Sequence, residues 1–320
     1  MTSDPGALLW HNAFALDVPV TNHAQDAAAV ELTAVVVAVT GEEPRVLTLG
    51  DGRALPSGPL ESAHRTLQTG LRSWVERQTH HPLGYIEQLY TFADRDRMRS
   101  GGRIISISYL GLTREAHTEG QEGSWQNWYR YFPWEDWRSG RPPSIPTILR
   151  LLRPWAKKAP DPATRRDRAR RIDVAFGADE SWNEELVLQR YELLYEAGLV
   201  AEGGATSSLP GQSMILDHRR ILATGIARLR AKIKYRAVVF ELMPESFTLL
   251  QLQRAVEALA GRRLHKQNFR RLIDQQGLVE ETGEISTGTG GRPAKLFRFR
   301  REVLLERAVS GSKLPLSRSA

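Results

Sequence analysis

The order of local signals between residues 248 and 300 constrains the fold of this chain more than any other feature. Thr248, followed by Gln251, has the pattern of a capping box at the start of a helix. A second helix is predicted over 265–277, after a turn of only a few residues, and strand, Gly-rich turn and strand follow it. Two helices joined by so short a turn and followed by a hairpin predict a winged helix-turn-helix.

The second of these helices carries side chains of the kind that read DNA. Phe269, Leu272 and Ile273 are expected on its buried face. The other face is basic and amide-rich, and such side chains form paired hydrogen bonds with guanine and adenine in the major groove. We therefore predict a recognition helix and a wing, with these DNA-binding residues: His265, Lys266, Gln267, Asn268, Arg270, Arg271, Arg292 and Lys295. A protein-binding winged helix or a solvated basic face is the alternative.

The charge of the chain is unevenly distributed. The 320 residues have a formal net charge of +7. From Gly211 onward there are 21 Lys and Arg against 10 Asp and Glu, whereas the first 210 residues have 23 against 27. A basic C-terminal part suits a polyanionic partner such as DNA. A solvated basic surface would explain the charge alone equally well.

The N-terminal part has the pattern of an α/β sandwich. Strands are predicted over 32–39, 45–49, 84–92 and 103–112, where β-branched and aromatic residues are concentrated between polar turns. A helix is predicted over 60–78, because its apolar residues recur at helical spacing. No internal repeat accompanies these elements.

An aromatic-rich segment over 125–143 follows these strands. Four of the eight tryptophans lie between Trp125 and Trp137, with arginines among them. Such a mixture can stack nucleobases, but in an insertion with little else to bury it is expected to form the core. The basic, Pro-punctuated stretch that comes next is expected to be a surface excursion or a linker helix.

Two amphipathic helices are predicted ahead of the winged helix. The first covers 185–200, and the second covers 214–235. The second has one continuous apolar stripe, formed by Leu222, Ile226, Leu229 and Ile233. This stripe is expected to close the first domain, to form a dimer seam, or to do both.

Residues 55–80 keep the outline of a catalytic motif. Read from Gly58, the spacing resembles the Nudix box, the loop–helix signature of pyrophosphohydrolases, which has an upstream glutamate and then R-E-x-x-E-E on a helix. Arg72 and Glu76 occupy their expected positions. Three other residues stand where the motif has glutamates: His64, Ser73 and Arg77.

The missing carboxylates predict that this site does not catalyse hydrolysis. Nudix hydrolysis needs a divalent metal, and hard Mg²⁺ prefers carboxylate oxygens, of which Glu76 alone is left. We therefore predict no catalytic residue and no metal site. Arg77 would instead place a positive charge where the cation would sit, which could attract a phosphate. Arg72 and Glu76 could alternatively form an i, i+4 salt bridge that only stabilises the helix.

Candidate ligand-binding residues are chosen by their position around this motif. They are Arg53, Arg72, Arg77, Gln88 and Arg103. Each could equally be a surface charge or a strand-edge side chain.

Long stretches of the chain resemble one family. The resemblance rests on DHRRILATGIARLRAKIKYRAVVFELMPESFTLLQLQRAVEALAGRRLHKQNFRRLIDQQGLVEETGE and GGRPAKLFRF, which are similar to the C-terminal half of the NrtR-like, Nudix-related transcriptional regulators of NAD metabolism. With YFPWEDWRSGRP and RYELLYEAGLV it extends over residues 30–302 and is strongest to the alphaproteobacterial NadQ-type repressors of NAD biosynthesis genes.

This resemblance implies a function. Such a protein would be a homodimer that binds double-stranded operator DNA through two winged helices and represses NAD biosynthesis genes. Its Nudix domain would sense an adenine nucleotide effector such as ATP, NAD or ADP-ribose, and no further cofactor would be required. The alternative is an active Nudix hydrolase of ADP-ribose or another nucleoside diphosphate derivative.

The expected architecture is α+β. A degenerate Nudix α/β/α sandwich over 1–233 would sense the ligand, with a helical, aromatic-rich insertion at about 114–212 and a closing helix at about 214–233. The winged helix-turn-helix would cover 234–302, followed by a basic tail over 303–320.

Composition excludes several other classes. The chain has no cysteine, which excludes disulfides and thiolate chemistry. It has no apolar run long enough to span a membrane, and no basic region precedes its first apolar stretch, so neither a membrane anchor nor a signal peptide is expected. These features favour a cytoplasmic protein.

Overall fold

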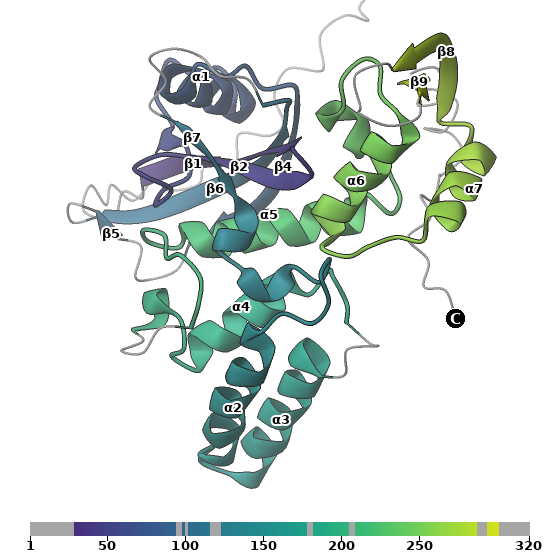
Figure 1. Cartoon of the computed structure of the whole chain (residues 1–320). Helices are drawn as coiled ribbons and strands as arrows, with labels where there is room; N and C mark the ends of the chain where they lie inside the picture. The colour runs from purple at the N-terminus through teal and green to yellow at the C-terminus, as the bar shows by residue number, and fades with distance from the viewer. Residues whose placement is uncertain are drawn as a thin grey trace, which may run out of the picture.

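The computed structural model describes residues 29–93, 98–99, 102–115, 123–177, 182–204, 209–286 and 293–300, with the backbone alone for residues 98, 99, 102 and 103. Figure 1 shows a mixed sheet with helices on both faces. A helical hairpin projects from one end of the molecule, and a small helix–hairpin unit lies beside the sheet. No described helix has the length and apolar character needed to cross a membrane.

The described strands ahead of the winged helix form one mixed sheet. Its main order is β4-β6-β1-β2-β7, with β3 paired to β1 and β5 paired to β6. The pair β1 and β6 is parallel and the other pairs are antiparallel. The bounds are β1 Ala29–Thr40, β2 Glu43–Thr48, β3 Ser57–Pro59, β4 Tyr85–Phe92, β5 Met98–Arg99, β6 Gly102–Leu112 and β7 Ser124–Asn127.

Strand β1 lies at the centre of two hydrophobic layers. Its side chains alternate between the faces of the sheet, so Leu32 and Val36 pack with helix α1 (Leu67–Thr79). Val35 and Val37 belong to the core on the other face, which helix α5 (His218–Lys232) covers. The result is the α/β/α sandwich that the sequence predicts, with α1 and α5 on opposite faces (Figure 1).

Helix α1 begins later than the prediction of 60–78. The chain from Ser57 to Pro59 is an edge strand paired with β1, and the residues after it form turns. The helix begins only after Thr66, whose side chain accepts a hydrogen bond from the backbone amide of Thr69. The extent of the helix is therefore set by this cap.

The aromatic segment forms a core, as expected. After β7 the chain continues into two short 3-10 helices, η1 Trp128–Arg130 and η2 Pro133–Glu135. Trp128, Phe132 and Trp134 are fully buried. The tryptophans of this segment are therefore mainly core residues, and the base-stacking alternative is wrong for them.

Three helices follow these 3-10 turns. The basic stretch, for which the sequence predicts a surface excursion or a linker helix, contains two of them. Helices α2 (Ser144–Lys157) and α3 (Pro162–Phe176) form a helical hairpin, and α4 (Val187–Glu196) packs against both α3 and α5. Asp161 caps α3 and a proline occupies its first turn, where a missing amide costs nothing. Helix α4 is shorter at both ends than the predicted 185–200.

The predicted stripe of the last helix in this part is buried within the chain. Leu222, Ile226, Leu229 and Ile233 all lie in the core beneath the sheet. A Cβ at Gly225 would contact Val35 at 2.8 Å, so α5 approaches β1 closely. Because the stripe is covered, it closes the sandwich and cannot serve as a dimer seam. The helix begins at His218 and not at 214, because Leu216 has a left-handed backbone with φ of 50°, and it ends at Lys232.

The C-terminal unit matches the winged helix-turn-helix prediction. A 3-10 turn, η5 (Val238–Leu242), leads to α6 Leu249–Ala260, α7 Lys266–Gln276 and the hairpin strands β8 Val279–Ser286 and β9 Ala294–Phe299. The capping box of Thr248 and Gln251 is formed in full. Gly261 and Gly277 end the two helices in the left-handed conformation, which glycine adopts without strain.

Candidate functional site: a basic helix and an altered Nudix box

Helix α7 separates an apolar face from a basic one. Phe269 and Ile273 are buried against the winged helix core. Leu272, expected on the same face, is half-buried. The predicted DNA-binding residues of this helix and its N-cap are all exposed: His265, Lys266, Gln267, Asn268, Arg270 and Arg271. The structure thus brings six of the eight predicted residues together on one surface.

The wing is a two-stranded hairpin next to this helix. Phe247, just before α6, forms an antiparallel bridge with Phe297 of β9, which ties the hairpin to the helices. Lys295 is exposed in β9 and forms an ion pair with Glu281 of β8 at 2.9 Å. It therefore lies on the face of the hairpin with its charge partly neutralised. Arg292 lies outside the described residues.

Glu257 of α6 holds the turn between the two helices. Its carboxylate accepts hydrogen bonds from the Leu264 amide at 2.9 Å, from Arg263 at 2.8 Å and from Arg254 at 3.0 Å. Burial raises the pKa of Glu257, but these bonds and one from Gln253 outweigh burial, and the net pKa is lower than its usual 4.5. The turn that orients α7 thus depends on one buried carboxylate.

The C-terminal end of α6 is held by residues that precede the winged helix. The Tyr129 hydroxyl donates to the Ala258 carbonyl at 2.7 Å, and Arg230 Nε donates to the Leu259 carbonyl at 2.9 Å. The Trp137 amide donates to the Gly261 carbonyl at 2.7 Å. The last carbonyls of a helix have no partner within the helix and carry its negative dipole end. The insertion and α5 therefore anchor the support helix of the winged helix.

A buried ionic cluster lies behind this anchor. Glu135 binds Arg190 at 2.6 Å and Arg230 at 2.7 Å, and all three side chains are completely or almost completely buried. The arginines belong to α4 and α5, so the cluster joins the aromatic segment, the insertion and the sheet helix. Reasoning from sequence missed these residues. The available signal was an acidic residue inside a run of buried aromatics.

The altered Nudix box is filled by its own side chains. The indole of Trp74 lies against Gly58, where a Cβ would overlap the ring, and its Nε1 donates to the Pro59 carbonyl at 2.8 Å. The Arg77 guanidinium stacks on the Trp74 ring at 4.5 Å and lies 3.9 Å from Glu61. Ser73 accepts only a long hydrogen bond from Arg77, at 3.5 Å. This part of the helix presents an aromatic–cation stack.

This site does not fit the divalent metal that the Nudix fold otherwise uses. His64 lies 3.7 Å from Glu61 and accepts the backbone amide of the same residue at 3.1 Å, so it is held in the loop ahead of α1. Within the described residues, no three His, Asp or Glu side chains converge as a metal site requires. Glu76 is exposed on the helix surface. The residues present therefore give no ligand set for a hard cation.

Arg72 binds backbone carbonyls and does not form the i, i+4 salt bridge with Glu76. Its guanidinium donates to the backbone carbonyls of Leu83 and Gly84, the latter at 2.9 Å. These carbonyls are within reach of Arg72 because the chain passes beside α1 just before it enters β4. Arg72 thus ties α1 to the start of β4.

The remaining ligand candidates lie apart from one another in the part of the chain that the structure describes. Arg53 is exposed in the turn after β2, where its carbonyl accepts the Ile215 amide, and Gln88 is exposed on β4. Arg103 lies in β6, and its side chain is outside the described residues. Cavities lie on α2 and between α3 and α4, and none of the five candidates lines either of them. The five ligand candidates therefore stay a prediction.

Comparison with known proteins gives the C-terminal unit a family. Residues 239–299 match the NrtR DNA-binding winged helix domain. Over 86 residues the chain is 43% identical to the ADPR responsive transcriptional repressor NtrR of Acinetobacter baylyi, which is 27% of this chain and 34% of that protein. The chain thus matches about a third of the length of this curated relative.

Solved structures extend the likeness to most of the fold. The crystal structure of Shewanella oneidensis NrtR complexed with a 27mer DNA is similar with a TM-score of 0.52 and 18% identity, covering 86% of this chain and 94% of that one. A MutT/nudix family protein from Enterococcus faecalis is similar with a TM-score of 0.51 and 15% identity, over 86% and 87%. At these identities the likeness shows the fold.

These matches agree with the Nudix fold and the winged helix derived above, while the NadQ branch stays a prediction. Residues 239–299 match the NrtR DNA-binding winged helix domain, and the fold of the chain as a whole is similar to those of Shewanella oneidensis NrtR and of a MutT/nudix family protein.

Proposed function

We propose that this protein is an effector-responsive repressor that binds operator DNA as a homodimer and controls NAD biosynthesis genes. The observation that carries the proposal is the face of α7, where six basic and amide side chains are exposed beside a wing. A helix of this kind enters the major groove, where its N-terminal residues reach base edges. The curated relative described as an ADPR responsive transcriptional repressor supports the same assignment.

The Nudix domain would act as a sensor that does not hydrolyse its ligand. Ser73 and Arg77 occupy two glutamate positions of the box, and Arg77 stacks on Trp74. A cation without a divalent metal can still attract the phosphates of an adenine nucleotide. ADP-ribose is the first effector to test because of the relative's name, with ATP and NAD as the other candidates. The protein would need no cofactor.

A direct test of DNA binding is an electrophoretic shift with promoter fragments of NAD biosynthesis genes. The full chain should bind specific fragments and prefer them over random sequence, and Lys266→Ala should weaken the preferred complex. Affinity should fall steeply with salt, by roughly 10³–10⁵-fold between about 50 and 200 mM for six to ten phosphate contacts. Binding without any preference among promoter fragments would contradict the proposal.

A hydrolysis assay separates the sensor from the alternative enzyme. The full chain is incubated with ADP-ribose, NADH or ATP and with Mg²⁺ or Mn²⁺, and the products are resolved by chromatography. We expect no turnover. Hydrolysis at an ordinary enzyme rate, about 1 s⁻¹ or faster, would make the protein an active Nudix hydrolase instead.

A further inference from the structure

The hairpin of α2 and α3 is a second concentration of positive charge, separate from the winged helix. Residues 141–176 contain ten Lys and Arg against three Asp. This surplus of seven equals the net charge of the whole chain. The hairpin projects from the sandwich at an end away from α7 (Figure 1). Charge this dense on a projecting element is a feature of surfaces that bind polyanions.

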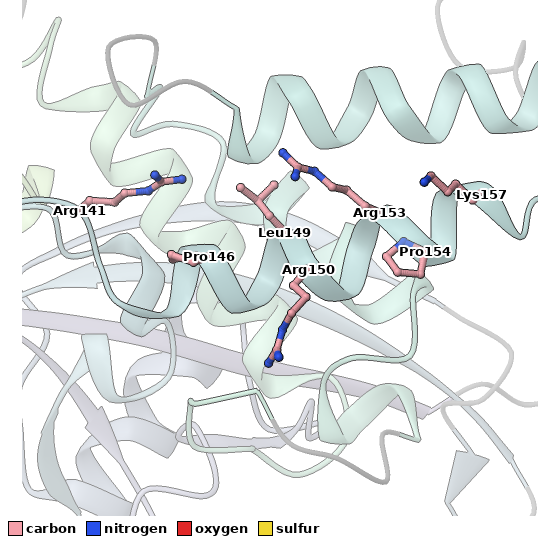
Figure 2. A pocket seen from close by; sticks show the side chains of 7 residues that line it. All are labelled: Arg141, Pro146, Leu149, Arg150, Arg153, Pro154 and Lys157. Atoms are coloured by element: carbon pink, nitrogen blue, oxygen red, sulfur yellow. The ribbon is translucent and has the colours of Figure 1, made fainter.

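Helix α2 has a buried face and a cationic face. Ile145, Ile148, Leu152 and Ala156 are buried. Arg150, Arg153 and Lys157 are exposed and follow one another at helical spacing on another face. They line a groove of about 480 Å³. Figure 2 shows the side chains of its lining: Arg141, Pro146, Leu149, Arg150, Arg153, Pro154 and Lys157.

These cations keep their charge available. Among the residues that the structure describes, Arg150, Arg153 and Lys157 form no ion pair, although Arg171 of the same hairpin pairs with Glu196 at 2.6 Å. Two of the three acidic residues of the hairpin already have partners within α3. Asp161 caps α3, and Asp167 binds Arg170 at 2.8 Å. Like charges along one helix face repel each other, so an anionic partner would relieve this repulsion.

The groove suits the backbone of a duplex better than other anions. From Arg150 to Lys157 the helix rises about 10 Å, and over that length of duplex axis one strand carries about three phosphates, one for each rise of about 3.4 Å. Trp155, the aromatic residue of α2, is already stacked under Arg168 at 4.0 Å, so it offers no free ring for unpaired bases. Leu149 is half-buried, and the face has no apolar anchor for a bilayer.

We propose that the α2–α3 hairpin is a second DNA-binding surface, which contacts the phosphate backbone of double-stranded DNA without reading bases. This inference rests on the proposed function, because it assumes that DNA is the partner of the chain. The hairpin would add phosphate contacts to those of α7 and the wing. Such contacts raise affinity for every sequence alike and leave the preference for an operator to α7.

The test compares two charge-matched variants of the full chain. One is Arg150→Gln/Arg153→Gln/Lys157→Gln. The control is Arg65→Gln/Arg114→Gln/Arg236→Gln, which removes three exposed cations from other parts of the surface. Binding to a long duplex of random sequence and to the same duplex with the preferred promoter site is measured by fluorescence anisotropy over a series of salt concentrations.

We expect the hairpin variant to bind both duplexes more weakly, with an unchanged ratio between them. The slope of log K against log salt should fall by about 2.7, since each lost phosphate contact contributes about 0.9. The control should keep the wild-type slope. Thermal unfolding of the hairpin variant should match the wild type, because the three side chains have no ion-pair partner among the described residues.

Several results would overturn the inference. Equal slopes for the hairpin variant and the control would remove the hairpin from the DNA contact. Loss of binding to phosphatidylserine vesicles with unchanged DNA binding would assign the surface to a membrane. The proposed function fails by a different result, namely the absence of any promoter preference in the wild-type chain, and the slope on random duplex still tests the hairpin in that case.

Discussion

Arg230 of α5 donates a hydrogen bond from Nε to the carbonyl oxygen of Leu259, in the last turn of α6, at 2.9 Å. The same guanidinium binds Glu135 at 2.7 Å. One buried side chain therefore connects the helix beneath the sheet, the aromatic segment and the support helix of the winged helix. This residue therefore places α5, which covers the sheet, in direct contact with the winged helix.

Replacement of Arg230 by Met should strongly destabilise the protein. Glu135 would keep Arg190 alone, and the Leu259 carbonyl would lose its donor. Removing one partner of a buried ion pair costs about 3–5 kcal/mol. Urea unfolding measures the loss. Arg228→Met, at an exposed position on the same helix, is the control and should stay within about 0.5 kcal/mol of the wild type. Equal losses in the two variants would contradict the structural role of Arg230.

The two helix-ending glycines should differ in their tolerance of a side chain. Both have positive φ, 73° for Gly261 and 56° for Gly277, so alanine costs about 1–2 kcal/mol at either site. At Gly261 a Cβ would also overlap the Glu135 carbonyl and lie 2.8 Å from Arg230, whereas at Gly277 the nearest atom is 3.7 Å away. We expect Gly261→Ala to be the more destabilising change and to weaken DNA binding. If the two variants had the same melting temperature, the close approach of Gly261 to Glu135 and Arg230 would contribute nothing to stability.

Glu257 should make the winged helix sensitive to acid. Its pKa is lower in the folded protein than the usual 4.5, so the unfolded chain binds the proton more tightly. The stability from this carboxylate is complete above that value and is lost as the pH falls below it. Glu257→Gln should cost about 1.5–3 kcal/mol at neutral pH, as for a hydrogen bond to a charged group. The difference from the wild type should shrink in unfolding curves below pH 4.5. A difference that is constant with pH would rule out the carboxylate as its origin.

Recognition helix and wing should affect specificity differently. Arg271→Ala should cost about 1–3 kcal/mol on the preferred operator and little on random DNA, as for a residue that reads a base. Lys295→Ala should weaken both complexes to the same extent, because a lysine that shares its charge with Glu281 can offer at most a phosphate contact. Selective loss at one operator with the Lys295 variant would reverse these roles.

An effector should stabilise the protein and depend on the Nudix helix. A ligand that binds only the folded state adds about 2.7 kcal/mol at one hundred times its Kd. Thermal unfolding with ATP, ADP, NAD, NADH and ADP-ribose will identify it, and we expect ADP-ribose to give the largest shift. Arg77→Ala should reduce this shift, with Arg65→Ala as an exposed control. If the Arg77→Ala variant showed the same ligand-induced rise in melting temperature as the wild type, the ligand would bind away from Arg77.

Local signals explain what could be predicted from the sequence. The capping box at Thr248 and the glycines at 261 and 277 fix both helices of the winged helix through backbone chemistry alone. The continuous β-branched run of β1 likewise predicts a buried central strand. For this stretch the sequence predicts a surface excursion or a single linker helix, whereas the structure has two helices, α2 and α3. Pro154 and the dense charge conceal their periodicity, although Asp161 followed by proline is a recognisable helix start.

The buried cluster and the partners of Arg72 could not be predicted, because they depend on contacts distant in sequence. Arg219 and Arg230 lie off the apolar stripe of α5, which suggests exposure, yet both are buried by pairing with Glu202 and Glu135. Arg72 binds carbonyls that only the return of the chain brings near. Position along a motif gives no information about such partners.

The anchored end of α6 also determines how this molecule can be divided. A fragment cut after residue 233 would retain Arg230 and Tyr129 but lose the carbonyls of Ala258 and Leu259 that they bind. The excised winged helix would expose those carbonyls to water and lose the contact that fixes the tilt of its first helix. Biochemical work on isolated halves would therefore describe two altered proteins, and interdomain communication can be studied only in the intact polypeptide.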